Sequence, residues 1–107
     1  MALFSRADIN EGVKTCRATE GAVLVDVRGR DEYAQGHIAG SINVPLQELQ
    51  LIEDQVPDTD TPLFVHCLAG TRSAQAVMMM KRMGYTNAQN IGGIQSWKGD
   101  VEKGSSW

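Results

Sequence analysis

One stretch of sequence decides the fold: Pro62-Leu63-Phe64-Val65-His66-Cys67-Leu68-Ala69-Gly70-Thr71-Arg72-Ser73. It opens on a short apolar run, residues 63–65, which predicts a buried strand. It leads into residues 73–83, where apolar side chains recur at helical spacing. Between the two lies a predicted loop that begins with Cys67 and ends with Arg72. Strand, loop and helix in this order form the repeating unit of parallel α/β sheets.

The position of Cys67 predicts its chemistry. It stands at the carboxyl end of the expected strand and close to the amino end of the expected helix. Open α/β sheets place ligands at this edge, and backbone N–H groups with the helix dipole favour an anion there. The same surroundings favour a thiolate over a thiol. We therefore expect a reactive Cys67 inside an anion-binding loop formed by Leu68, Ala69, Gly70, Thr71, Arg72 and Ser73.

Length and composition exclude several classes of protein. A chain of 107 residues predicts a single domain, and a formal net charge of −3 without a basic cluster argues against a nucleic-acid surface. The two cysteines form neither a disulfide framework nor a C-x-x-C pair, which argues against a zinc site and a thioredoxin-like dithiol. We expect no metal and no cofactor.

The amino-terminal stretch, residues 1–10, does not resemble a signal peptide, because Arg6 and Asp8 interrupt it. No other apolar run is long enough to span a membrane. We therefore expect a cytoplasmic protein without a membrane partner, although a mature secreted chain would also lack its signal peptide.

Strands and helices are expected to alternate along the rest of the chain. Ser5 followed by Asp8 is typical of a helix start, and Gly21 ends that helix. The other expected elements are strands at 22–27, 42–44 and 88–91, helices at 31–35, 46–55 and 94–98, and a polar tail at 100–107. This alternation predicts a mostly parallel sheet with helices on both faces.

The loops after Val27, Val44 and His66 should then meet at one edge of the sheet. Arg28 would lie there, either as a substrate contact or in an ion pair with Glu32.

Other polar residues near this edge favour structural roles. Asp26 favours a role as a hydrogen-bond acceptor that braces a loop, and His37 that of a packed, hydrogen-bonded histidine. The His66 side chain should point to the opposite face from Cys67, which makes it a poor general base. Cys16 falls on an apolar helix stripe and is either a small buried hydrophobe or a resolving thiol for Cys67.

Several stretches together resemble the single-domain rhodanese family of sulfurtransferases, over about residues 5–99. They are Leu24-Val25-Asp26-Val27-Arg28, Glu32-Tyr33, Gly36-His37-Ile38-Ala39-Gly40-Ser41-Ile42-Asn43-Val44-Pro45, Val65-His66-Cys67-Leu68-Ala69-Gly70-Thr71-Arg72-Ser73, Gly84-Tyr85, and Asn90-Ile91-Gly92-Gly93-Ile94 with Trp97. Each piece alone is a weak signal, but their order and spacing together are highly specific.

This resemblance implies a three-layer α/β/α fold around a five-stranded, mostly parallel sheet. It also implies a persulfide intermediate on Cys67, with sulfur taken from a donor such as thiosulfate and passed to cyanide or a thiol. The uncharged Leu68 and Ala69 leave polysulfide or a protein persulfide open as the donor. A persulfide-donating or thioredoxin-like protein is therefore a candidate partner.

Two alternatives remain open at this point. Cysteine phosphatases and arsenate reductases are the nearest rivals, but phosphatases place five residues between cysteine and arginine. Here only four residues separate Cys67 from Arg72, so the loop should form a tighter cradle that suits a single sulfur atom better than a tetrahedral oxyanion. The second alternative is a non-catalytic or sulfur-trafficking module that binds a protein partner, although an inactive member would be expected to lack Cys67.

Overall fold

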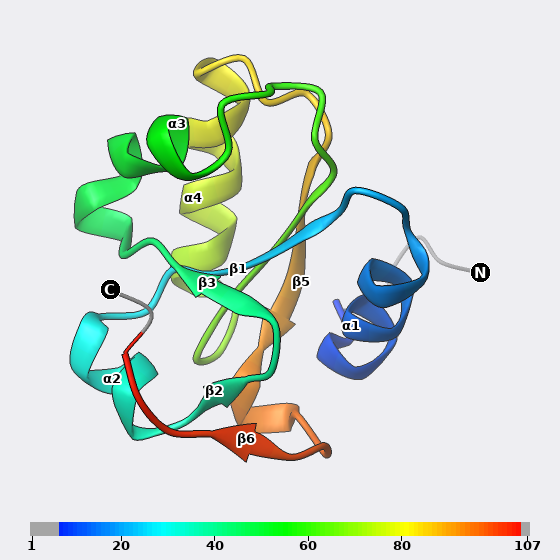
Figure 1. Cartoon of the computed structure of the whole chain (residues 1–107), viewed down its shortest axis with the longest axis vertical. Helices are drawn as coiled ribbons and strands as arrows, with labels where there is room; N and C mark the ends of the chain where they lie inside the picture. The colour runs from blue at the N-terminus through cyan, green and yellow to red at the C-terminus, as the bar shows by residue number, and fades with distance from the viewer. Residues whose placement is uncertain (1–6, 106–107) are drawn as a thin grey trace.

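The structure, a computed structural model, describes residues 7–105. Its main sheet contains β1 (Val23–Asp26), β3 (Ser41–Asn43), β4 (Leu63–Cys67) and β5 (Ala88–Gly93), in the order β3-β1-β4-β5 (Figure 1). Every neighbouring pair in this sheet is parallel. The two central strands, β1 and β4, are mostly apolar and buried on both faces, as parallel strands covered by helices require.

The expectation of five strands in this sheet is wrong, because the described residues place four there. The two remaining strands, β2 (His37–Ile38) and β6 (Val101–Glu102), form a separate antiparallel pair. Each is only two residues long, and β2 takes its hydrogen bonds from β6 rather than from β3. The predicted tail therefore contributes a strand, and the Gly104 N–H also donates to the Ala34 carbonyl at 2.9 Å.

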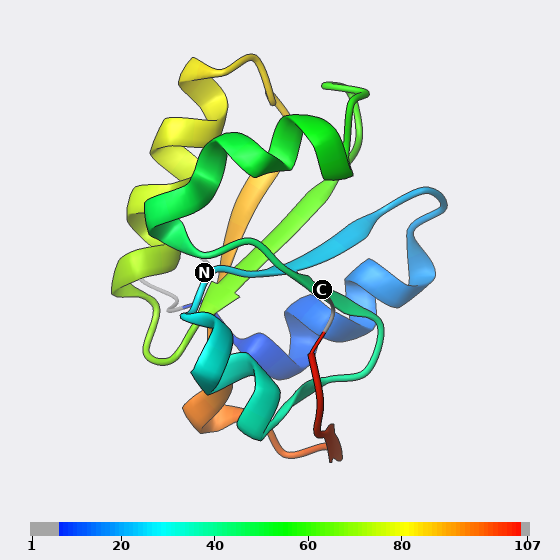
Figure 2. The ribbon, with the colours of Figure 1, turned by 60° about the vertical axis from the view of Figure 1, so that its left-hand side comes forward.

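Helices cover both faces of the main sheet, which confirms the three-layer α/β architecture (Figures 1 and 2). On one face α1 (Ile9–Ala18) packs its buried side chains against Leu24, Phe64 and Ile91. On the other face lie η2 (Leu46–Leu51), α3 (Ile52–Gln55) and α4 (Thr71–Arg82), whose apolar side chains pack against alternate residues of β1 and β4. The remaining helices are α2 (Arg30–Gln35) and η3 (Ile94–Ser96).

Several predicted boundaries shift in the structure. α1 begins at Ile9, with Asp8 as its N-cap accepting the Asn10 N–H at 2.9 Å, and Ser5 lies outside the described residues. The single helix expected at 46–55 is a 3₁₀ helix followed by one α-helical turn, with non-helical backbone at Glu48. Only the second of these segments is α-helical, and the last predicted helix is likewise a short 3₁₀ turn, η3.

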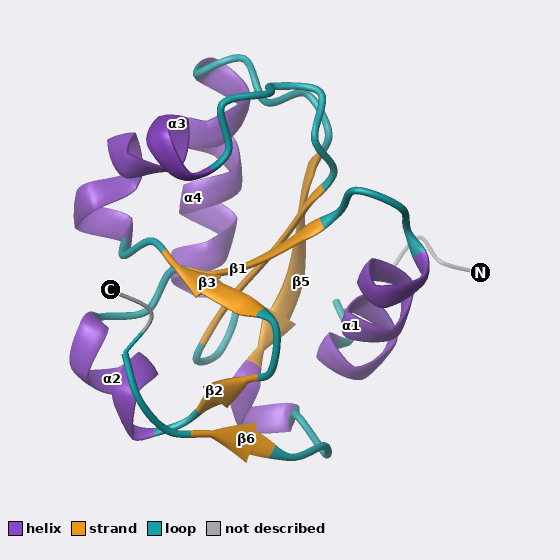
Figure 3. Ribbon diagram, in the orientation of Figure 1, coloured by secondary structure: helices purple, strands orange, loops and turns teal. Residues whose placement is uncertain are grey.

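The loops that follow β1, β3 and β4 meet at one sheet edge, as predicted (Figure 3). The Val27 N–H donates to the His66 carbonyl at 3.0 Å, and the Leu46 N–H donates to the Val27 carbonyl at 3.1 Å. These bonds continue the sheet beyond its regular strands and hold the start of each loop in place. Among residues 7–105, no helix is both long and apolar enough to cross a membrane.

Candidate active site

Cys67 is the last residue of β4, and its side chain belongs to the apolar cluster on the α4 face of the sheet. Only 1% of the residue is exposed. The Gly70 N–H donates to Sγ at 3.0 Å, and the Ser73 hydroxyl lies 3.3 Å from the same sulfur. The sulfur is therefore enclosed by hydrogen-bond donors rather than by apolar groups alone.

Two opposing effects act on the pKa of the Cys67 thiol. Burial raises that pKa because it disfavours the charged thiolate. Hydrogen bonds from the Ser73 hydroxyl and from the backbone N–H groups of Ser73, Gly70 and Ala69 lower it, and together they outweigh burial. The net result is a pKa below the ordinary value of a cysteine, so that the loop favours the nucleophilic thiolate.

Helix α4 begins at Thr71, two residues earlier than the sequence predicted, so the loop after Cys67 is shorter than expected. Its N-cap is Gly70, whose φ of +105° lies in the region that favours glycine. This left-handed residue turns the chain from the strand into the helix within three positions. As a result, Thr71, Arg72 and Ser73 form the first turn of α4, whose free N–H groups and dipole favour an anion.

The loop from Leu68 to Ser73, which we call the sulfur loop, packs tightly on the end of β5. A Cβ atom on Gly93 would come within 2.1 Å of the Leu68 carbonyl oxygen and 2.6 Å of the Ala69 Cα. The Gln95 N–H donates to the Leu68 carbonyl at 3.1 Å and fixes the loop from the same side. Glycine is therefore required at position 93 by the close approach of the loop. Its backbone conformation does not require glycine, because it is extended rather than left-handed.

Asn90 braces the loop, a role that the sequence did not reveal. Its Nδ2 donates to the Gly70 carbonyl at 3.2 Å, while its Oδ1 accepts the Gly92 N–H at 2.9 Å. The same oxygen lies 2.7 Å from the Ser73 hydroxyl. Asn90 therefore connects β5 to both residues that bond the Cys67 sulfur. The only signal in the sequence was a polar residue inside a short predicted strand.

Arg72 forms a two-pronged ion pair with Glu32 of α2. The guanidinium Nη1 and Nη2 lie 2.7 and 3.0 Å from the two carboxylate oxygens. Glu32 also accepts the Gly29 N–H at 2.9 Å. The hydrogen bonds from Arg72 outweigh partial burial and lower the pKa of Glu32 to about 2, so the pair stays charged over the ordinary pH range. Glu32 was expected as a possible partner of Arg28, but the structure pairs it with Arg72 instead.

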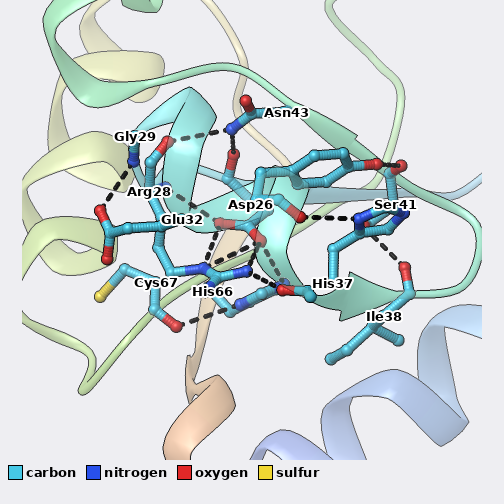
Figure 4. Close-up of polar contacts among 12 residues, drawn as sticks. Asp26, Arg28, Gly29, Glu32, His37, Ile38, Ser41, Asn43, His66 and Cys67 are labelled. Atoms are coloured by element: carbon cyan, nitrogen blue, oxygen red, sulfur yellow. Dashed lines mark hydrogen bonds and ion pairs between the residues drawn. The ribbon is translucent and has the colours of Figure 1, made fainter. Parts of the chain in front are cut away.

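Arg28 lies in a buried cluster at the end of β1 (Figure 4). Its guanidinium donates to both oxygens of Asp26 at 2.8 to 3.1 Å and to the Gly36 carbonyl at 2.7 Å. The residue is only 6% exposed, and its carboxylate partner is Asp26 rather than Glu32. Asp26 also accepts the Arg28 N–H at 2.9 Å, in agreement with its predicted bracing role.

The two histidines occupy packed positions. His66 is fully buried on the opposite side of β4 from Cys67, and its Nε2 lies 3.8 Å from an Asp26 oxygen. Burial lowers the pKa of His66, and its Nδ1 bonds the Cys67 carbonyl at 3.2 Å. His37 stacks on Tyr33 with ring centroids 3.8 Å apart. Its Nδ1 also bonds the Tyr33 carbonyl at 2.9 Å, which confirms the prediction of a packed, hydrogen-bonded histidine.

The remaining candidate site residues lie either in the loop after Cys67 or on the opposite face of the sheet. Leu68, Ala69 and Thr71 are exposed at the surface of the loop, and Leu68 carries the largest apolar side chain there. Cys16 is buried in α1 among the apolar residues of the opposite sheet face. Cys16 and Cys67 therefore belong to different apolar clusters, and burial raises the pKa of the Cys16 thiol. The structure agrees with the buried-hydrophobe interpretation of Cys16.

Known proteins are similar to this chain in sequence and in architecture. The chain is 42% identical over 72 residues to thiosulfate sulfurtransferase PspE of Escherichia coli, covering 66% of this chain and 69% of that protein. It is 32% identical over 94 residues to human thiosulfate:glutathione sulfurtransferase, covering 76% and 82% of the two chains. A solved structure described as a rhodanese with anions from E. coli superposes with a TM-score of 0.72 and 38% identity, covering 78% of this chain and 99% of that one.

The family comparison covers almost the whole described region. The model of the Rhodanese-like domain family matches residues 9–100, a range that runs from the first residue of α1 to just before β6. It includes all four strands of the main sheet and the complete Cys67 loop. On the strength of this match and of the shared fold, the chain belongs to the rhodanese-like domain family.

Proposed function

We propose that the chain is a rhodanese-type sulfurtransferase that carries sulfane sulfur on Cys67. The observation that carries this proposal is the cradle around Sγ, where the Gly70 N–H and the Ser73 hydroxyl approach a buried sulfur at the start of α4. This arrangement favours a thiolate before the reaction and suits a terminal persulfide sulfur after it. The relatives named thiosulfate sulfurtransferases support the same activity.

In the first step, a lone pair of the Cys67 thiolate attacks the outer sulfur of the donor. With thiosulfate, a new S–S bond forms to Cys67, and the S–S bond of the donor breaks with its electron pair leaving on sulfite. The products are a Cys67 persulfide anion and SO₃²⁻, so the total charge of −3 is unchanged. This is covalent catalysis, in which one difficult transfer is divided into two displacements.

In the second step, an acceptor attacks the terminal sulfur of the persulfide. Cyanide forms thiocyanate and releases the Cys67 thiolate, while a thiol forms a new persulfide in the same way. The name of the human relative, which includes glutathione, supports a thiol as acceptor. The name of a further relative, a putative sulfur carrier protein of Bacillus subtilis, supports a protein partner as a second possibility for either half of the cycle.

The residues have distinct roles in this proposal. Cys67 is the catalytic nucleophile, and the loop from Leu68 to Ser73 holds its anionic sulfur. Arg28 is buried and bonded to Asp26, which keeps it from contacting a substrate. We therefore propose that Arg28 stabilises the edge of the sheet. Two free cysteines, one of them with a lowered thiol pKa, suit a reducing compartment, and we propose the cytoplasm on that basis.

Steady-state kinetics test this proposal. With thiosulfate and cyanide varied together, a persulfide intermediate predicts parallel double-reciprocal lines, because the first product leaves before the acceptor reacts. Cys67→Ser should abolish turnover, while Cys16→Ser should retain it because Cys16 lies on the other face of the sheet. Intersecting lines, or turnover by Cys67→Ser, would contradict the proposal.

A further inference from the structure

Two arginines lie in or beside the sulfur loop, and carboxylates bind both of them. Arg72, in the first turn of α4, spans the two oxygens of Glu32, and Arg28, at the end of β1, spans those of Asp26. The other side chains between Cys67 and Ser73 are uncharged. The loop therefore meets an incoming anion with backbone N–H groups, while the positive charges beside it are already neutralised.

This charge balance bears on the choice of donor. Thiosulfate is a dianion, and its leaving group, sulfite, carries the same charge out of the site. A persulfide, R–S–S⁻, brings a single negative charge at its reacting end. The N–H groups of the loop suit one anionic sulfur, but a dianion gains further from a guanidinium that is not paired with a carboxylate.

Glu32 is held firmly in the place where it neutralises Arg72. The Gly29 N–H bonds one carboxylate oxygen at 2.9 Å, and Arg72 bonds both. In Figure 4 the Glu32 carboxylate and the Cys67 sulfur lie on the same side of the buried Asp26 cluster. Arg72 stands in the first turn of α4 next to Ser73, whose hydroxyl lies 3.3 Å from the Cys67 sulfur. In agreement with this placement, the pKa of Arg72 is raised chiefly by Glu32 and further by the charge of Cys67.

We propose that Glu32 is a specificity-determining residue. By binding Arg72 across both oxygens, it withholds that guanidinium from the donor and so selects singly charged persulfides over dianionic thiosulfate. This inference rests on the proposed transfer of sulfur through Cys67. It makes a residue 40 positions away in the chain, on α2, responsible for the charge that a donor meets at the loop.

Glu32→Gln tests the proposal with little disturbance of the backbone, because a glutamine carbonyl can still accept the Gly29 N–H. The variant leaves the positive charge of Arg72 uncompensated beside the sulfur. For thiosulfate, kcat/KM should rise about fivefold. For an alkyl persulfide with an uncharged tail, it should change by less than about twofold. The gain with thiosulfate should shrink as ionic strength rises, because salt screens an exposed charge.

Two further variants separate this effect from a general change of charge. Glu53→Gln makes the same substitution on α3, away from the loop, and should leave both donors unaffected (Figure 1). In the Glu32→Gln background, Arg72→Gln should remove the gain with thiosulfate, because that gain depends on the guanidinium.

A failure of the inference about Glu32 can be distinguished from a failure of the proposed function. If Glu32→Gln leaves kcat/KM for thiosulfate unchanged, or lowers it equally for both donors, Glu32 serves only to hold the loop and the inference is overturned. If neither donor adds sulfur to Cys67 in the unmodified chain, the proposed function itself fails. Mass measurement of the persulfide distinguishes that failure from a failure of the inference alone.

Discussion

Gly93 lies directly against the Leu68 carbonyl, so closely that a Cβ atom on Gly93 would stand 2.1 Å from the carbonyl oxygen. This contact joins the end of β5 to the first residue after the nucleophile. The position of the sulfur loop is therefore determined by the absence of a side chain on a neighbouring strand, in addition to the bonds within the loop itself.

Gly93→Ala should displace the loop and impair sulfur transfer. Because the new methyl group would meet backbone atoms on both Leu68 and Ala69, the loop must shift, and a misplacement of about 1 Å costs roughly a hundredfold in rate. Gly36→Ala is the matched control, since its Cβ would make only ordinary contact with Val101 at 3.6 Å. Equal rates of persulfide formation in the two variants would contradict this view of Gly93.

The lowered pKa of Cys67 predicts how its alkylation depends on pH. The rate of reaction with iodoacetamide should follow the thiolate, with a midpoint below the ordinary value of a cysteine thiol. Ser73→Ala should move this midpoint upward, because it removes the hydroxyl that bonds the sulfur and retains the backbone N–H. Thr71→Ala, which removes an exposed hydroxyl from the same helical turn, should not move it. An unchanged midpoint in Ser73→Ala would show that the hydroxyl does not stabilise the thiolate.

Arg28→Met should destabilise the fold strongly. It would leave the buried Asp26 carboxylate without its principal partner, and breaking one side of a buried ion pair costs about 3–5 kcal/mol. Arg30→Met offers a comparison at the surface, where Arg30 pairs with a half-exposed Glu48 and the expected loss is at most about 1 kcal/mol. Urea denaturation measures both, and similar free energies of unfolding for the two variants would count against a structural role for Arg28.

The pair between Glu32 and Arg72 predicts a dependence of stability on acid pH. The pKa of Glu32 is about 2 in the folded chain, below its ordinary value of 4.5, so the unfolded chain binds more protons between these values. The stabilisation is therefore complete above about pH 4.5 and is lost as the pH falls toward 2. Because the pair is partly exposed to solvent, its contribution should be at most about 1 kcal/mol.

The difference in unfolding free energy between the unmodified chain and Glu32→Gln isolates this contribution from other carboxylates. That difference should shrink as the pH is lowered from 5 to 2. A difference that stays constant over this range would mean that Glu32 does not titrate with a lowered pKa in the folded chain.

The main elements of the fold could be predicted because their signals are local. The apolar run before Cys67 and the helical spacing after Ser73 specify a strand and a helix, and such units in series specify a parallel sheet. The number of strands could not be predicted in this way. β2 and β6 are two residues long and show no periodicity, and their pairing joins His37 to Glu102 across most of the chain.

The partners of charged residues were harder to predict for a similar reason. Arg72 and Glu32 stand 40 positions apart, and only the placement of α2 beside the loop brings them together. Arg28 pairs with Asp26, two positions away, because both side chains are buried at the end of β1 and an unpaired charge would be costly there. Asn90 contacts Gly70 through the packing of β5 on the loop, which no local pattern reveals.

The intact mass of the chain after incubation with thiosulfate or polysulfide is the most direct test of whether Cys67 carries sulfur. Transfer through a Cys67 persulfide predicts a gain of one sulfur atom that cyanide removes, that persists in Cys16→Ala and that is absent in Cys67→Ser. If neither donor adds sulfur to a chain whose Cys67 still reacts readily with iodoacetamide, then the cradle activates the thiol for another purpose, and the proposed transfer from small donors is contradicted.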